Sequence, residues 1–118
     1  MEESILTSIK KLLGIADEDK SFDIDIIMHI NSVLMIIMQE WHGQTSFTIS
    51  DDSATWKDFL GEANIDYEAV KTLVYLRVRL LFDPPTNSFV IQSMNETIKE
   101  LEWRMYCWKD NERIDALS

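Results

Sequence analysis

The side chains best suited to acid–base, nucleophilic or metal chemistry are few in this sequence and lie far apart in it. Its two histidines, His29 and His42, form no helical metal pair, and no zinc motif of the H-E-x-x-H kind occurs. Its one cysteine, Cys107, would need a neighbouring base and an orienting group to act as a nucleophile. Phosphate-binding glycine loops, nucleophile elbows and dinucleotide fingerprints do not occur either. The sequence therefore predicts no enzyme, no cofactor and no metal site.

These side chains have structural interpretations instead. His29 lies in an apolar helical segment and is interpreted as a hydrogen-bonded core residue, whereas His42 lies where a helix ends and a cation favours the dipole. Cys107 lies near a Trp-rich helix end and is interpreted as a structural or exposed thiol. Acidic pairs such as Asp51-Asp52 are interpreted as solvated surface or helix caps, because acids are abundant throughout the chain.

The composition indicates one folded domain with a strongly acidic balance. The 118 residues suffice for a single core, and 46% hydrophobic against 27% charged residues argues against disorder. The 11 basic and 21 acidic residues give a net charge of −10, which disfavours binding to nucleic-acid phosphates and to anionic membranes. Residues 24–38 are the most apolar stretch but too short to span a bilayer, and no secretory signal is visible. We therefore expect an intracellular protein without a membrane partner.

Hydrophobic periodicity predicts an all-α fold, a small bundle of about five helices. Only 3 Gly and 2 Pro interrupt the chain, which favours a few long helices over many short strands. The expected helices cover residues 3–13, capped by Gly14, residues 23–41, residues 53–60, a stretch from Asp66 to the prolines, and a stretch from Asn87 or Ser88 to Trp108. In this prediction residues 1–108 form one helical domain and residues 109–118 a polar, flexible tail.

The corner between the last two long helices consists of Asp83, Pro84 and Pro85. Neither proline has an amide donor, and each ring clashes with the preceding turn, so neither can continue a helix. Asp83 precedes a proline and is therefore pushed out of the helical region. The sequence predicts a rigid, angle-setting corner that holds the fourth and fifth helices in an angled or antiparallel pair.

Two features of the helices leave their partners open. The second helix is apolar nearly all round, so it is either central in its domain or shared between the domain and a partner. Arg77 and Arg79 are two residues apart on the fourth helix and point to nearly opposite sides. In one interpretation, one arginine reaches water over the core and the other pairs with an acid. In the other interpretation, one of them pairs with an acidic residue of another subunit.

The segment YLRVRLLFDPPTNSFVIQSMNETIKELEWRM, residues 75–105, resembles the small head–tail connector (adaptor) proteins of long-tailed bacteriophages and prophages. Those proteins close with a helix, a Phe-Asp-Pro-Pro corner and a final helix that ends in a Glu-Leu-Glu-Trp-Arg stretch, here residues 82–85 and 100–104. Upstream, residues 22–34 and 54–60 also resemble the corresponding segments, so the resemblance covers nearly the whole chain. The chain departs from the pattern in its longer C-terminal tail.

The resemblance implies a structural virion protein, a homo-oligomeric ring under the portal that joins capsid to tail and provides a channel for DNA. Its partners would be the portal protein and the tail-completion or head-closure proteins, and it would move from the host cytoplasm to the head–tail interface on assembly. The candidate subunit-interface residues are Met28, Met35, Ile36, Arg77, Arg79 and Trp103. The candidate contacts with portal or tail are Phe47, Ile49, Trp108, Ile114 and Leu117.

The net charge of −10 is also compatible with a second function, an acidic decoy that mimics DNA and occupies a nucleic-acid-processing partner. Such a mimic would space its acids along one face like phosphates, whereas here acids alternate with basic residues in the fifth helix. In a connector, the same charge would line the channel and repel the DNA phosphates. Competition with DNA for a nuclease or a basic column distinguishes the two functions.

Overall fold

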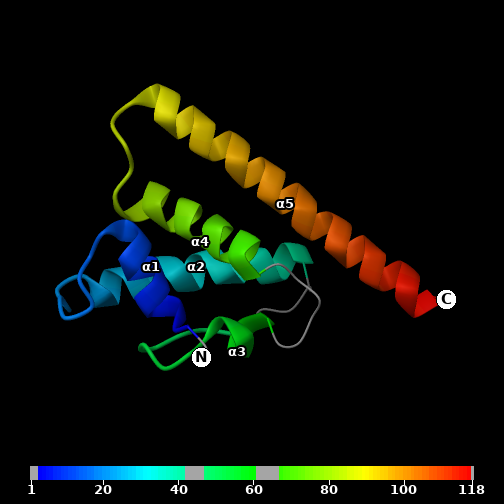
Figure 1. The fold of residues 1–118 in the computed structure, drawn as a ribbon, viewed down its shortest axis with the longest axis horizontal. Helices are drawn as coiled ribbons and strands as arrows, with labels where there is room; N and C mark the ends of the chain where they lie inside the picture. The colour runs from blue at the N-terminus through cyan, green and yellow to red at the C-terminus, as the bar shows by residue number, and fades with distance from the viewer. Residues whose placement is uncertain (1–2, 42–46, 61–66, 118) are drawn as a thin grey trace.

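The computed structural model describes residues 3–41, 47–60 and 67–117, with side chains for residues 3–39, 47–60 and 67–107. This part of the chain forms helices and contains no strand. The helices are α1 (Ile5–Leu13), α2 (Asp23–Trp41), α3 (Trp56–Leu60), α4 (Tyr67–Phe82) and α5 (Ser88–Leu117). The predicted all-α bundle, with a corner between its last two long helices, is confirmed (Figure 1).

The first helix ends as the sequence predicts, at Gly14. The φ of Gly14 is 82°, in the left-handed region that glycine adopts without strain. Its amide donates to the carbonyl of Lys11 at 3.1 Å, which satisfies one of the free carbonyls at the helix end. At the other end of α1, the hydroxyl of Ser4 accepts the amide of Thr7 at 3.3 Å and caps the first turn.

The third helix begins later than predicted, at Trp56. The reason is a capping box: the hydroxyl of Thr55 accepts the amide of Asp58 at 3.1 Å, and the Asp58 carboxylate accepts the amide of Thr55 at 2.9 Å. The residues before the helix are tied to the start of α1, because the amide of Ile5 donates to the carbonyl of Ala54 at 3.0 Å. The stretch therefore serves as a linker between two helices rather than as part of the helix.

The last helix is longer than predicted, since its backbone continues past Trp108 to Leu117. Figure 1 shows this C-terminal part of α5 running beyond the other helices. The flexibility of residues 109–118 stays a prediction. Asp66, the expected cap of α4, and His42 lie outside the described residues.

The core of the bundle is built around α4, which packs against each of the other four helices (Figure 1). Apolar residues three and four apart predict a seam along α5, made of Ile91, Met94, Ile98, Leu101, Met105 and Trp108. The structure buries Met94, Ile98, Leu101 and Met105 and leaves Ile91 half buried, and the side chain of Trp108 lies outside the described part. The best buried apolar side chains of the other helices are Ile5, Ile9, Ile26, Ile30, Leu34, Val70, Leu73, Val74 and Val78. One contiguous core thus joins α1 to α5.

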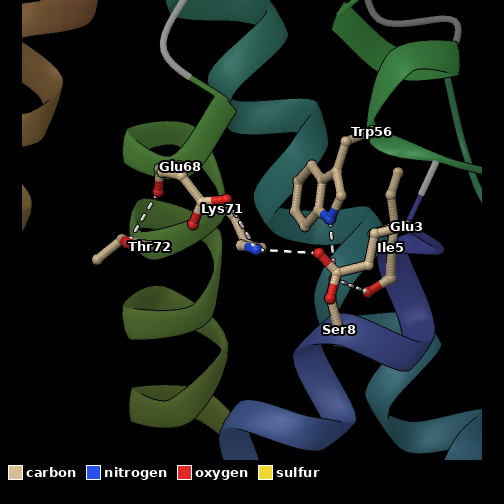
Figure 2. A network of polar contacts seen from close by, with 7 residues as sticks. All are labelled: Glu3, Ile5, Ser8, Trp56, Glu68, Lys71 and Thr72. Atoms are coloured by element: carbon tan, nitrogen blue, oxygen red, sulfur yellow. Dashed lines mark hydrogen bonds and ion pairs between the residues drawn. The ribbon is translucent and has the colours of Figure 1, made fainter. Parts of the chain in front are cut away.

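Polar contacts hold the N-terminus against α3 and α4, as Figure 2 shows. The indole Nε1 of Trp56 donates to the buried hydroxyl of Ser8 at 2.8 Å. On α4, the Nζ of Lys71 lies 3.0 Å from a carboxylate oxygen of Glu3 and 3.2 Å from one of Glu68. Partial burial alone would lower the pKa of Lys71, but the hydrogen bonds to these two carboxylates outweigh it and raise the pKa above its usual value.

Replacing Trp56 by phenylalanine should lower the free energy of unfolding by about 1–2 kcal/mol. The indole donor is lost, while the hydroxyl of Ser8 stays buried and keeps only its own bond to the carbonyl of Ile5. Urea denaturation followed by circular dichroism measures the change. The matched control is Trp103→Phe, since that ring is exposed and should cost less than about 0.5 kcal/mol. Equal effects of the two substitutions would mean that the buried hydrogen bond adds nothing net.

A lysine is buried in the last turn of α1. Lys10 is only 1% exposed, whereas the next residue, Lys11, is exposed. The Nζ of Lys10 donates to the carbonyls of Asp17 at 3.1 Å and Asp19 at 2.8 Å, and lies 2.9 Å from the carboxylate of Asp23. These three oxygens replace the water that a buried ammonium loses. Lys10 therefore holds the linker between α1 and α2, residues 14–22, in place.

The corner joins two helices that run in opposite directions, so that α5 folds back along α4 (Figure 1). α4 ends at Phe82, and the amide of Asp83 still donates to the carbonyl of Arg79 at 2.9 Å. After the prolines, the side-chain oxygen of Asn87 accepts the amide of Phe89 at 2.8 Å and caps α5. Each end of the corner is thus closed by a hydrogen bond.

The end of α4 is anchored on α2 by aromatic contacts. The ring of Phe82 lies 5.6 Å from that of Phe22 and 6.3 Å from that of His29, both edge to face. His29 is half buried and serves here as a packing partner. Within the described residues, no group of three or more His, Cys, Asp or Glu side chains could hold a metal ion. The aromatic contacts of Phe82 therefore hold the start of the corner against the rest of the bundle.

Candidate interaction surface

A groove of ≈480 Å³ runs along the outer face of α2. Ile24, Met28 and Met35 project into it and are 84%, 57% and 47% exposed. They lie on the side of α2 opposite to the buried Ile26 and Ile30, because these positions are half a helical turn apart. We call this surface the α2 groove, lined by Ile24, Ile27, Met28, Asn31, Ser32, Met35, Phe47 and Thr48.

One wall of the α2 groove is a loop that Asn31 holds against the helix. The side-chain amide of Asn31 donates to the carbonyl of Ile49 at 2.9 Å, and its side-chain oxygen accepts the amide of Ile49 at 2.8 Å. Two hydrogen bonds to one residue leave the loop little freedom. The ring of Phe47 packs against that of Phe59, with 5.1 Å between the ring centroids. This contact holds Phe47 in its position at the side of the α2 groove.

The two loop residues expected to contact portal or tail are thus engaged within the protomer. Phe47 is half buried, and Ile49 is 4% exposed and belongs to the core. A contact through Ile49 would require the loop to leave Asn31. The role of both residues in partner contacts stays a prediction, as does that of Trp108, Ile114 and Leu117, whose side chains lie outside the described part.

A second apolar surface lies on α5. Trp103 and Tyr106 are 64% and 54% exposed, and their rings stack at 5.8 Å with an interplanar angle of 17°. Lys99 lies one turn before Trp103 on the same side. We call Lys99, Trp103 and Tyr106 the α5 patch. It borders a hollow of ≈630 Å³ between α5 and the other helices, which is also lined by Ile37, Leu73, Arg77, Glu102 and Met105.

The two arginines of α4 have partners in the protomer. The Nη2 of Arg77 lies 2.8 Å from a carboxylate oxygen of Glu102, which joins α4 to α5 with both side chains half buried. The Nη1 of Arg79 donates to the hydroxyl of Tyr75 at 3.0 Å, and this hydrogen bond raises the pKa of Arg79 above its usual value. A contact of either arginine with a second subunit stays a prediction.

The sequence-based candidates divide between exposed and engaged positions. Met28, Met35 and Trp103 are exposed, whereas Ile36 is half buried and lines a hollow beside Leu80. Ile24 and Tyr106 were missed as interface candidates. Their signal was present in the sequence, since Ile24 precedes Met28 by four residues and Tyr106 follows Trp103 by three.

The α2 groove and the α5 patch are both apolar surfaces. No described helix is long and apolar enough to cross a membrane. The sequence profile of the phage connector protein family matches residues 5–112, which include both surfaces. The chain belongs to the phage connector protein family. No curated protein and no solved structure matches the chain. The phage connector protein has a structural role, and its exposed apolar side chains are candidates for contacts with other virion proteins.

Proposed function

We propose that this phage connector protein forms a closed ring under the portal and joins the head of the virion to its tail. The observation that carries the proposal is the pair of exposed apolar surfaces on one small protomer of the phage connector family, the α2 groove and the α5 patch. Apolar side chains gathered on a surface mark sites of protein contact more often than chance. Two such sites are what each subunit of a ring needs.

The arrangement of the two surfaces supports a ring rather than a symmetric dimer. A closed ring uses a heterologous interface, in which one surface of a subunit meets a different surface of the next. The α2 groove lies on the outer face of α2, the α5 patch lies on α5 at the rim of a hollow, and α4 packs against both helices (Figure 1). One subunit can therefore contact two neighbours at once.

Further features support the partners and the channel. The C-terminal part of α5 runs beyond the other helices, where it can reach the portal protein or the tail-completion or head-closure proteins (Figure 1). The net charge of −10 suits a conduit for DNA, because carboxylates in a channel repel phosphates and prevent sticking. The protein would be part of the virion at the head–tail interface.

The experiment that tests the proposal is co-purification with the portal protein encoded in the same genomic neighbourhood, followed by negative-stain imaging. A ring of the connector under the portal is the expected result. A free protein that is monomeric in solution is compatible with this proposal, because assembly of the ring can depend on the presence of the portal protein. No association between folded portal and connector at high concentration would overturn the proposal.

The angle between α4 and α5 provides a second test. Replacing Pro84 and Pro85 together by glycine should abolish ring formation on the portal while lowering the free energy of unfolding by only about 1–2 kcal/mol. Glycine removes the fixed φ of each proline, so the corner no longer holds one angle, and a closed ring needs the same rotation at every interface. Imaging of the portal complex and urea denaturation measure the two effects. The control is Thr86→Ala in the same corner, which should assemble normally; normal rings from the double glycine variant would show that the corner does not set the angle.

A further inference from the structure

We propose that the α5 patch of one copy seats in the α2 groove of the next copy, with Trp103 between Met28 and Met35. This inference rests on the proposed ring and names the surfaces that hold its neighbours together. Three properties of the described side chains carry it: their shape, their chemistry and their charge.

The shapes of the two surfaces are complementary. Trp103 and Tyr106 form a stacked aromatic pair on α5 at the rim of the hollow between α5 and the other helices, and both rings are mostly exposed. The α2 groove is a hollow of ≈480 Å³ with a helix on one side and the loop of Phe47 on the other. Large aromatic side chains in a pocket commonly dominate the energy of an interface.

The chemistry of the groove suits an indole. Met28 and Met35 are flexible side chains whose sulfur atoms make favourable contacts with aromatic rings. Phe47 offers an aromatic wall to the second ring of the pair. Met28 and Met35 are 57% and 47% exposed and Phe47 is half buried, so a partner gains the burial of the surface that each side chain still exposes.

A positive charge remains unpaired at the α5 patch. Lys99 makes no ion pair or hydrogen bond with any part of the chain that the structure describes. The other charged side chains within one turn of Trp103 are paired inside the protomer, as Arg77–Glu102 at 2.8 Å and Arg104–Glu100 at 3.1 Å. The net charge that the patch presents to a neighbour is therefore that of Lys99.

An unpaired negative charge lies on the flank of α2 beside the α2 groove, where Asp25 lines a neighbouring hollow with His29 and Phe82. Asp25 is exposed next to Ile24 and one turn before Met28, and within the described ranges it has no ion-pair partner, whereas Asp23 is taken by Lys10. With α5 of one copy parallel to α2 of the next, placing Lys99 against Asp25 puts Trp103 about 6 Å further along, past Met28 at about 4.5 Å and before Met35 at about 15 Å. An interface between two α5 patches would instead contain two unpaired Lys99 charges, while the nearby Glu100 and Glu102 are already paired, which disfavours a symmetric pair.

Cross-linking tests this contact directly. One variant carries Asp25→Cys and another Lys99→Cys, both with Cys107→Ser, and they are mixed and assembled on the portal protein. A flexible bismaleimide, which spans the longer gap that a lysine–carboxylate pair leaves between its backbones, should give a dimer of the two variants, and neither variant alone should cross-link. A chain with both cysteines should give a ladder of longer species. Rings that are visible by imaging but give no mixed dimer, or that give a dimer of either variant with itself, would overturn the inference and leave the proposed ring intact. Absence of any ring would overturn the proposed function itself, and this inference with it.

Substitutions on the two surfaces give an independent readout. Trp103→Glu and Met28→Glu should each weaken ring assembly about 30-fold or more, the loss typical of a central interface residue. Both side chains are exposed, so each variant should fold, which circular dichroism checks. Phe89→Glu, at an exposed position of α5 outside the patch, is the matched control and should assemble as the wild type does. Wild-type assembly by Trp103→Glu would contradict the inference.

The charge pair gives a reciprocal test. Lys99→Asp and Asp25→Lys should each weaken assembly, and the chain carrying both substitutions should recover most of it, because the pair is restored with reversed sign. Added salt should weaken wild-type assembly more than that of a Lys99→Gln variant. If the double substitution assembles no better than either single one, the two residues do not face each other in the ring.

Discussion

Replacing Lys10 by methionine should lower the free energy of unfolding by about 3 kcal/mol, a large share of the stability of a small domain. Methionine fills a similar volume but leaves the Asp23 carboxylate without its partner, and the carbonyls of Asp17 and Asp19 lose their donor. Removing one member of a buried pair costs more than the pair contributes, because an uncompensated charge remains. Urea denaturation followed by circular dichroism measures the loss.

Two further variants separate this effect from a general cost of losing a lysine. Lys11→Met changes the exposed neighbour and should shift stability by less than about 0.5 kcal/mol. The double variant with Lys10→Met and Asp23→Leu should regain part of the loss, since the stranded carboxylate is gone. If Lys10→Met lowers the free energy of unfolding no more than Lys11→Met does, the buried ammonium does not hold the linker between α1 and α2.

Replacing Asn31 by alanine should cost about 2–4 kcal/mol, because the amide and the carbonyl of Ile49 both lose their hydrogen-bond partner. The loop that carries Phe47 should then detach from α2, and the α2 groove should lose one wall. Hydrogen exchange of the Ile49 amide reports the detachment, and urea denaturation reports the loss of stability. Ring assembly should weaken as well if Trp103 of a neighbour seats in this groove.

The control for this substitution is the next residue on the same helix. Ser32 is exposed and its hydroxyl donates only to the carbonyl of Met28 in its own helix. Ser32→Ala should therefore leave both the stability and the exchange of Ile49 unchanged. Fast exchange in the Ser32→Ala variant, or slow exchange in the Asn31→Ala variant, would contradict the role given to Asn31.

The sequence by itself determined the helices and much of the core. Periodic apolar residues identified the α5 seam from Met94 to Met105, and Gly14 marked the end of α1. The two prolines located the corner between α4 and α5. These features are local, because a cap, a helical period or a fixed φ depends on residues within a few positions of one another. The resemblance to the connector family, now shown for residues 5–112, was carried by the same local pattern.

Only the tertiary structure decided which polar side chains the fold uses and which apolar ones it leaves exposed. From the sequence, Lys10 could have been a solvated charge at a helix end. In the structure, three oxygens from the linker after α1 and from the start of α2 contact its Nζ. Ile49 was expected at a partner contact and lies in the core, because Asn31 on a distant helix holds its backbone. A helix that is apolar nearly all round does not reveal its buried side in advance. In the structure, α4 packs against one side of α2, and this packing leaves Ile24, Met28 and Met35 exposed on the other side. Burial depends on which surfaces meet in space, and neighbours in the chain do not determine that.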